Sequence, residues 1–178
     1  EIGIVNNGEI SRIRKLKNEE SNFTCLKAMI DDTYANLLKE DAIKEDALIR
    51  FKGDVVLDMA GDECFSFKEG FVLDRGNIII DGQGYSIDAN HFTRIFTISA
   101  SNVTIRNLTL KNARADEVGA VKNTGNVNLS SLTIEGCRQT RSGAIFFNEG
   151  EITAERIFMR SNRGGIYNKS GKVTLDIS

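Results

Sequence analysis

An apolar spacing that occurs four times in the second half of the chain constrains its fold more than any other feature. The successive sets are Val103, Ile105, Leu108 and Leu110; Val127, Leu129, Leu132 and Ile134; Ile152, Ala154, Ile157 and Met159; and, begun once more, Val173 and Leu175. Their first residues lie 24, 25 and 21 residues apart. Within a set the apolar alternation shifts phase once, which predicts two short strands joined by a tight corner. A period of this length with strands and little helical signal is typical of a β-solenoid.

A third strand completes each repeat. Its expected inward pairs are Phe96 and Ile98, Val121 and Asn123, Ile145 and Phe147, and Ile166 and Asn168. The same pattern extends upstream, with two extra residues in the corner at 81–84, through Phe71, Leu73, Ile78, Ile80, Tyr85 and Ile87. Three strands per repeat of about 21–25 residues predict an all-β fold, a right-handed parallel β-helix from about residue 49 to residue 178.

Stacking would also align the outward residues of successive repeats. One expected row contains Thr104, Asn128, Thr153 and Thr174, and another contains Lys111, Glu135 and Arg160. Cross-strand pairs of this kind contribute about 0.2–1 kcal/mol each. We interpret both rows as a solvated sheet face.

Residues 1–48 are interpreted as a polar segment followed by a capping helix over about 22–39, with Ser21 and Asn22 at its start. The apolar face of this helix would consist of Phe23, Leu26, Ile30, Tyr34, Leu37 and Leu38. Such a helix would cover the first coil, which otherwise exposes core and unpaired strand edges. The last repeat stops at Ser178, so we expect a truncated β-helix over 49–178, prone to self-association through open edges.

Composition argues against several classes of function. The net charge of −2 gives no general attraction to nucleic acid or anionic membranes, and no window of 18 apolar residues predicts a membrane span. The chain begins at Glu1 without a signal peptide, so we expect any targeting segment to lie outside it. Cys25, Cys64 and Cys137 form no CxxC motif and His91 is the single histidine, so we expect no metal site. The odd number of cysteines and their wide spacing favour reduced, mostly buried thiols, with one disulfide as the alternative.

Polysaccharide cleavage, which many β-helices catalyse, requires paired carboxylates across the scissile bond. The candidate carboxylates are Asp81, Asp88, Asp116, Glu117 and Glu135. The corner at 81–84 (DGQG) resembles a structural turn of polygalacturonases, but the catalytic motifs of that family have no match. No calcium-binding acidic cluster of the polysaccharide-lyase type gathers near Arg138 and Arg141. We therefore expect a non-catalytic chain, with a carbohydrate-active enzyme fragment as an alternative.

A longer resemblance covers about 110 residues from Phe67 onward. It rests first on residues 77–90 (NIIIDGQGYSIDAN) and 94–112 (RIFTISASNVTIRNLTLKN). It rests also on a short motif of the GGAI type that returns three times, at 118–125 (VGAVKNTG), 142–150 (SGAIFFNEG) and 163–171 (RGGIYNKSG). These stretches resemble the adhesin-like surface proteins of methanogenic archaea. The GGAI-type return is also similar to that of bacterial polymorphic outer-membrane proteins. The resemblance implies an extracellular, cell-surface protein that binds glycans or proteins of another cell or matrix. It implies no cofactor, while the charge and hydropathy described above predict no nucleic-acid partner and no direct membrane insertion.

Corner loops supply the candidate ligand-binding residues, which we expect on one side of the rod: Arg138, Arg141, Arg160 and Arg163. A basic patch of this kind would bind an acidic glycan or a carboxylate. Aromatic side chains expected to point outward, where rings stack on sugars, are Phe146, Phe158 and Tyr167. The alternative is a solvated row of turns on a structural stalk.

Asn-x-Ser/Thr motifs occur at Asn22, Asn102, Asn107, Asn128 and Asn168. We take Asn102, Asn107 and Asn128 as candidate sites of N-glycosylation, and we expect Asn168 to point inward. Asparagine, serine and threonine are also preferred at the corners and outer positions of this fold.

Overall fold

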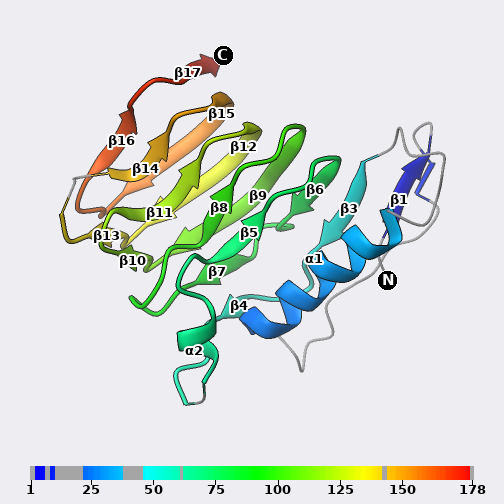
Figure 1. Cartoon of the computed structure of the whole chain (residues 1–178), viewed down its shortest axis with the longest axis horizontal. Coiled ribbons are helices and arrows are strands. Elements are labelled where there is room, and N and C mark those ends of the chain that lie inside the picture. The colour runs from blue at the N-terminus through cyan, green and yellow to red at the C-terminus, as the bar shows by residue number, and fades with distance from the viewer. Residues whose placement is uncertain are drawn as a thin grey trace.

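The computed structural model describes residues 3–6, 9–10, 22–37, 46–60, 62–141 and 144–176. Parallel strands of successive repeats stack into a rod, with the helix α1 (Phe23–Leu37) at the N-terminal end and the last repeat at the other (Figure 1). The chain is a right-handed parallel β-helix with three strands per coil. This confirms the predicted fold class, including the helix that covers the N-terminal end.

Strands that bend around a corner dominate a ten-stranded sheet. Its parallel strands are β3 (Ala47–Arg50), β6 (Ile78–Asp81), β9 (Val103–Lys111), β12 (Asn126–Glu135), β15 (Glu151–Arg160) and β17 (Lys172–Asp176). The second halves of β9, β12 and β15 continue onto a second face, where β4 (Val55–Val56) and β7 (Ser86–Asp88) precede them. At the N-terminal edge, β1 (Gly3–Asn6) pairs antiparallel with β3 and with β2 (Glu9–Ile10).

The third face is a five-stranded parallel sheet. Its strands are β5 (Phe71–Leu73), β8 (Phe96–Ile98), β11 (Val118–Asn123), β14 (Ala144–Asn148) and β16 (Gly165–Asn168). The short strands β10 (Arg114–Ala115) and β13 (Arg138–Gln139) pair in the loop between the second and third faces, and α2 (Glu63–Ser66) lies between β4 and β5. The inward side chains form one continuous core.

The strand register follows the predicted repeat. Val127 pairs with Val103 in one neighbouring coil and with Ile152 in the other, and the remaining members of each set align in the same way. The predicted rows of outward residues also align, so that Glu135 lies between Lys111 and Arg160. The repeat therefore specifies both the stacking and the inward face of the first two strands.

A left-handed residue at each corner explains the shift in apolar phase. Asn107, Ser131 and Arg156 lie between the first and second strands with φ of 51°, 52° and 52°. The next corner repeats this conformation at Asn112, Gly136 and Ser161, with φ of 50°, 65° and 54°. One such residue redirects the strand without ending its ladder, so the apolar alternation restarts in the opposite phase.

The third strand departs from the prediction in one coil. Phe146, not Ile145, pairs with Val121, and Phe146 is 2% exposed instead of pointing outward. The cause is a β-bulge, because β11 has one residue more than β14 between two aligned positions. Phe147 takes the outward position, and its ring centroid lies 5.7 Å from that of Tyr167.

Tyr85 is a second departure, since the sequence pattern places it in the core but it is 38% exposed. Its counterpart in the next coil is Leu108, which is 2% exposed. Leu108 packs over the corner of the preceding coil, where a Cβ on Gly82 would lie only 2.5 Å from the leucine Cδ1. The core space at this corner is therefore filled by Leu108, and the two extra residues of the corner carry Tyr85 to the surface.

The helix α1 covers the first coil with the face that its sequence predicts. The buried residues of this face are Phe23, Leu26, Ile30 and Tyr34. The Phe23 ring lies 4.6 Å from that of Phe71, and the Asn22 Oδ1 accepts a hydrogen bond of 2.9 Å from the backbone N–H of Cys25, as expected of a cap. The rest of the predicted helix (38–39) and the polar segment at 11–21 lie outside the described residues.

A ladder of asparagine amides supports the corner after the third strand. Nδ2 of Asn123 donates to Oδ1 of Asn148 (2.7 Å), and Nδ2 of Asn148 donates to Oδ1 of Asn168 (2.8 Å). Asn123 and Asn148 are fully buried, and Asn168, in the last coil, is exposed. Gly150 approaches the preceding coil so closely that a Cβ would lie 2.0 Å from the Gly125 carbonyl oxygen. The sequence analysis placed Asn123 and Asn168 inward but not Asn148, and it did not predict the bonds between them.

Candidate functional site

The candidate site lies at the corner between the second and third faces, near β10 and β13 (lower left in Figure 1). Arg114 in β10 pairs with Arg138 in β13, and Arg138 pairs through an isolated bridge with Arg163 in the next coil. These three exposed residues therefore occupy one position in three consecutive coils, about 4.8 Å apart along the rod. We call them the arginine stack.

The structure brings two of the four predicted arginines into this stack. Arg160 lies instead at the end of β15, on the second face, where its Nε donates to the Glu135 carboxylate (2.6 Å). Arg141 is exposed and lies three residues after Arg138, next to residues that are not described. The sequence analysis did not include Arg114 in the patch, although it precedes Arg138 by one 24-residue period.

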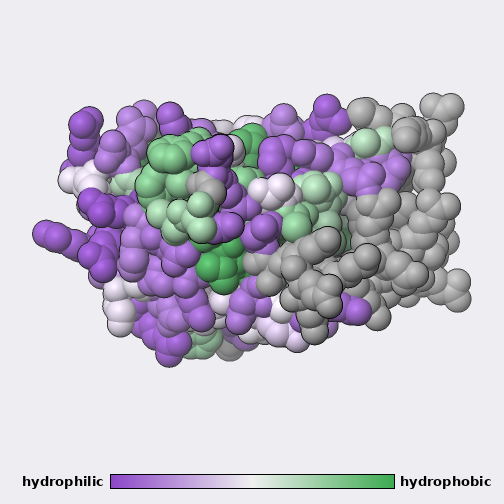
Figure 2. All heavy atoms as spheres, turned by 90° about the horizontal axis from the view of Figure 1, so that it is seen from below, coloured by the Kyte–Doolittle hydropathy of each residue, from purple (hydrophilic) through white to green (hydrophobic). Residues whose placement is uncertain are grey.

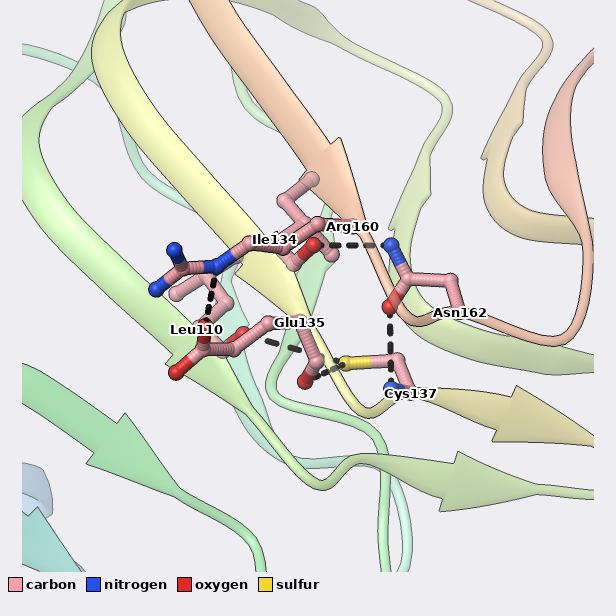
Figure 3. A network of polar contacts seen from close by, with 6 residues as sticks. All are labelled: Leu110, Ile134, Glu135, Cys137, Arg160 and Asn162. Carbon is pink, nitrogen blue, oxygen red and sulfur yellow. Dashed lines mark hydrogen bonds and ion pairs between the residues drawn. The ribbon is translucent and has the colours of Figure 1, made fainter.

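A polar network that includes Cys137 and Asn162 fixes the corner (Figure 3). The side chain of Asn162 donates to the Ile134 carbonyl (2.7 Å) and accepts from the backbone N–H of Cys137 (2.9 Å). The Cys137 thiol contacts the carbonyl oxygens of Glu135 (3.3 Å) and Leu110 (3.8 Å). These bonds connect three coils at Cys137 and Asn162, the residues that directly precede Arg138 and Arg163 in the chain.

Cys137 is part of this support and is unsuited to act as a nucleophile. Burial is the largest influence on its thiol and raises its pKa to about 11. The thiol is therefore protonated at neutral pH and is available as a weak donor to the carbonyl groups of the corner. Cys64 and Cys137 are buried and Cys25 is half-buried.

A shallow groove of about 330 Å³ follows the corner. It is lined by His91, Asn112, Gly136, Cys137, Arg138, Ser161, Asn162 and Arg163. Two guanidinium groups, an imidazole and a hydroxyl group thus border one open surface. Guanidinium groups pair bidentately with carboxylates and sulfate-like anions, so this groove is suited to an anionic ligand.

Acidic groups lie near the corner as well. The carboxylate of Asp116, two residues after Arg114, accepts a hydrogen bond of 2.7 Å from the Thr140 hydroxyl. The charges of Asp88 and Glu135 act on Cys137, which lines the groove. Among the described residues, Arg114, Arg138 and Arg163 form no ion pair.

Aromatic side chains are exposed on the strands that flank this corner. Phe158 lies on β15 before the corner and is 64% exposed, and Tyr167 lies on β16 after it and is 51% exposed. Both point outward as predicted. Phe147, which the sequence analysis placed inward, accompanies Tyr167 instead of Phe146.

The candidate glycosylation residues have different environments. The Nδ2 atom of Asn102 donates to Asp46 (2.9 Å) and to Asn77 (2.5 Å), and that of Asn107 donates to Asp81 (3.1 Å). These amides stabilise left-handed corners. Asn128 is exposed on the outward row of β12.

The amides of the remaining two motifs also have local roles. Asn22 caps α1 through its Oδ1. Asn168 donates from Nδ2 to the Gly171 carbonyl (2.7 Å) at the end of the asparagine ladder.

The carboxylates considered for catalysis mostly support the corners. Burial alone would raise the pKa of Asp81, but hydrogen bonds from Asn107 and Gln83 and the charge of Arg106 outweigh it and lower the pKa. The Asp88 carboxylate accepts from the Asn112 amide at 2.9 Å. Within the described ranges, no group of three or more His, Cys, Asp or Glu side chains is placed to hold a metal ion. No described helix has both the length and the apolar character needed to cross a bilayer.

An apolar groove of about 250 Å³ lies between α1 and the segment from α2 to β5. Nearby, the rings of Phe65 and Phe92 are exposed and lie 5.9 Å apart. Figure 2 views the molecule from the side of α2 and shows apolar side chains gathered among hydrophilic ones. Lys27 and Asp31, which line this groove, pair with each other, so it lacks the convergent polar groups of the arginine stack.

No family model, curated protein or solved structure matches the chain. The assignment of a site therefore depends on the geometry of the corner.

Proposed function

We propose that this chain is a non-catalytic, adhesin-like module of a cell surface that binds an acidic glycan at Arg138 and Arg163. The single observation that carries this proposal is the stacking of these two exposed arginines beside an open groove. Their spacing of about one coil presents two guanidinium groups in a row, which suits a linear ligand that bears repeated anionic groups.

The surroundings of the groove favour a glycan over a small anion. An open, shallow groove contacts one side of an extended chain, whereas small molecules usually bind in enclosed pockets. Phe158 and Tyr167 offer exposed aromatic faces on the two strands that flank the corner. Sugar rings would stack on such faces while carboxylates or sulfates pair with the arginines.

The resemblance to adhesin-like surface proteins supports the extracellular, cell-surface part of the proposal. The three GGAI-type returns coincide with β11, β14 and β16 and with the corner that follows each strand. Their asparagines form the ladder, which is buried at Asn123 and Asn148, and Gly150 permits close approach of the coils. The repeated motif therefore has a structural role, and ligand specificity would reside in the arginine corner.

The test is binding to an array of acidic and neutral glycans, followed by calorimetric titration of any ligand found. We expect selective binding of carboxylated or sulfated glycans. The double variant Arg138→Ala with Arg163→Ala should lower the affinity by a factor of ten or more, because charged hydrogen bonds contribute about 1.5–3 kcal/mol each.

The matched control is Arg141→Ala with Arg160→Ala, which removes the same number of charges outside the arginine stack. This control should change the affinity less than about threefold, by weakening long-range attraction alone. Equal losses in the two double variants would contradict a defined site. Absence of binding by the wild-type chain would favour a structural stalk.

A further inference from the structure

Five asparagines stand in Asn-x-Ser/Thr motifs, and the fold uses the side chains of most of them. An N-linked glycan is attached at Nδ2, so a sugar on an amide that donates a structural hydrogen bond displaces that contact. Asn22 is half-buried where α1 meets β4 and forms a bridge with Val56. The amides that donate are those of Asn102 (to Asp46 and Asn77), Asn107 (to Asp81) and Asn168 (to the Gly171 carbonyl).

Asn128 is the exception. It lies in the first half of β12 and is exposed, and among the described residues its side chain takes part in no hydrogen bond or ion pair. Its motif continues with Leu129 and Ser130. Side chains alternate along a strand, so Asn128 and Ser130 project outward together, whereas Leu129 is buried in the core. The amide and the hydroxyl of this motif therefore lie on the same side, facing solvent.

The neighbours of Asn128 leave room for a sugar. The strand register places Thr104 of the preceding coil and Thr153 of the next coil on either side of it. Both side chains are short, and adjacent strands lie about 4.8 Å apart. Because β12 pairs with a strand on each side, this environment belongs to the interior of the rod. Asn102 and Asn107, in contrast, lie in left-handed corners with φ of 58° and 51°.

We propose that Asn128 is the site of N-glycosylation in this chain. The donor is a lipid-linked oligosaccharide whose first sugar is held by a pyrophosphate group. The bond between C1 of that sugar and the pyrophosphate oxygen breaks, a bond from C1 to Nδ2 of Asn128 forms, and Nδ2 loses one proton. The lipid pyrophosphate leaves with the electron pair of the broken bond, so nothing is oxidised or reduced.

Glycosylation of Asn128 rests on the proposed cell-surface location, because N-glycans are carried by secreted and surface proteins. Asn128 lies on the first face of the rod, whereas Arg138 and Arg163 lie at the corner between the second and third faces. A glycan on Asn128 therefore leaves the arginine corner open. It covers the threonine row of the first face with a hydrated chain.

Secretion of the full chain from cultured eukaryotic cells, behind a signal peptide, tests this proposal. Intact mass is measured first, and peptides are then mapped after enzymatic deglycosylation, which converts a glycosylated Asn into Asp. We expect one glycan per chain, on Asn128. Asn128→Gln and Ser130→Ala should each abolish the mass increase, and Ser130→Ala does so with the asparagine in place. Asn126→Gln is the matched control, at an exposed asparagine of the same strand outside any motif, and should retain the glycan.

A secreted chain without a glycan on Asn128, or with its glycan chiefly on another motif, would overturn the proposal. Glycan-array binding of the secreted wild type and of Asn128→Gln measures the proposed function separately. Equal binding by the two proteins would support a glycan that lies away from the arginine corner, and binding by Asn128→Gln alone would contradict that placement. Absence of array binding by both proteins would count against the acidic-glycan function, while the mass and the peptide map still decide the modification of Asn128.

Discussion

The two ends of the rod are built from the same repeat but differ in what covers them. Phe71 and Ile49, in the first coil, are almost completely buried, whereas Ile166 and Leu175, in the last coil, are about half exposed. The strands at both ends have the same geometry and the same inward pattern. In a solenoid, therefore, the burial of an inward residue depends on the neighbouring layer as much as on its own strand.

Aromatic packing makes the covered end stable. Phe23 of α1 is fully buried and contacts the rings of Phe67 (5.3 Å) and Phe71 (4.6 Å). These contacts connect the helix to the third face of the first coil. The exposed end has no such layer among the described residues, so we expect truncations of side chains to be tolerated better there.

The largest expected effect is at the covered end. Phe23→Ala should lower the free energy of unfolding by about 3–5 kcal/mol, the usual cost of a large cavity. Ile166→Ala should cost about 1 kcal/mol or less, because half of that side chain already contacts water. Urea denaturation of dilute samples measures both values. Equal losses would contradict the difference between the ends.

The asparagine ladder offers a second test of the same difference. Asn148→Ala should cost about 2–3 kcal/mol, because it removes the shortest bond of the buried Asn123 amide and the bonds that Asn148 makes to the backbone of Gly150. Asn168→Ala should cost less than about 1 kcal/mol, since water can replace the lost group at the exposed end. Hydrogen exchange of the backbone amides in β11 and β14 should accelerate only in Asn148→Ala. A similar loss in both variants would mean that the last coil is as stable as the inner ones.

Much of this fold can be predicted from the sequence because inward residues repeat with a fixed period. Val103, Val127 and Ile152 align as the spacing requires. In one coil the sequence did not reveal which residues of the third strand align with the neighbouring coil. Ile145 and Phe146 are both apolar and both buried, and apolar character alone does not reveal a bulge. Tyr85 was misplaced for a related reason, since a corner with two extra residues changes which side chain fills the core.

The candidate site was only partly predictable. The sequence placed Arg138 and Arg163 together, with Arg141 and Arg160, because all four lie in corner loops that stacking brings to one side. The period alone would have selected Arg114, Arg138 and Arg163. Arg160 is close to Arg163 in the chain, but the left-handed Ser161 between them turns the strand onto another face. At the corners, therefore, the repeat period predicts which arginines lie together in space better than closeness in the chain does.

Alkaline pH should affect the covered end through Tyr34. Burial is the main cause that raises the pKa of this phenol from 10.0 to about 12, and its hydroxyl donates to the Arg75 carbonyl at 2.9 Å. Because the folded state holds the phenol proton more tightly, Tyr34 contributes fully to the free energy of unfolding below pH 10, and this contribution is lost as pH rises from about 10 to 12. In this range the free energy of unfolding of the wild type should fall by up to about 1.4 kcal/mol more per pH unit than that of Tyr34→Phe. Parallel pH profiles of the two proteins would disprove the role of Tyr34.

The smallest expected effect concerns the surface charges of the last coils. The carboxylate of Glu135 pairs with Arg160, whose side chain is 69% exposed. Exposed pairs of this kind contribute about 0–1 kcal/mol, so Glu135→Gln should lower the free energy of unfolding by less than about 1 kcal/mol, and added salt should reduce the difference further. Urea denaturation at low and high salt measures it. Salt screens the solvent-exposed part of an ion pair. If the free energy of unfolding fell by more than about 2 kcal/mol at both salt concentrations, this ion pair would therefore stabilise the exposed end more than expected of a surface pair.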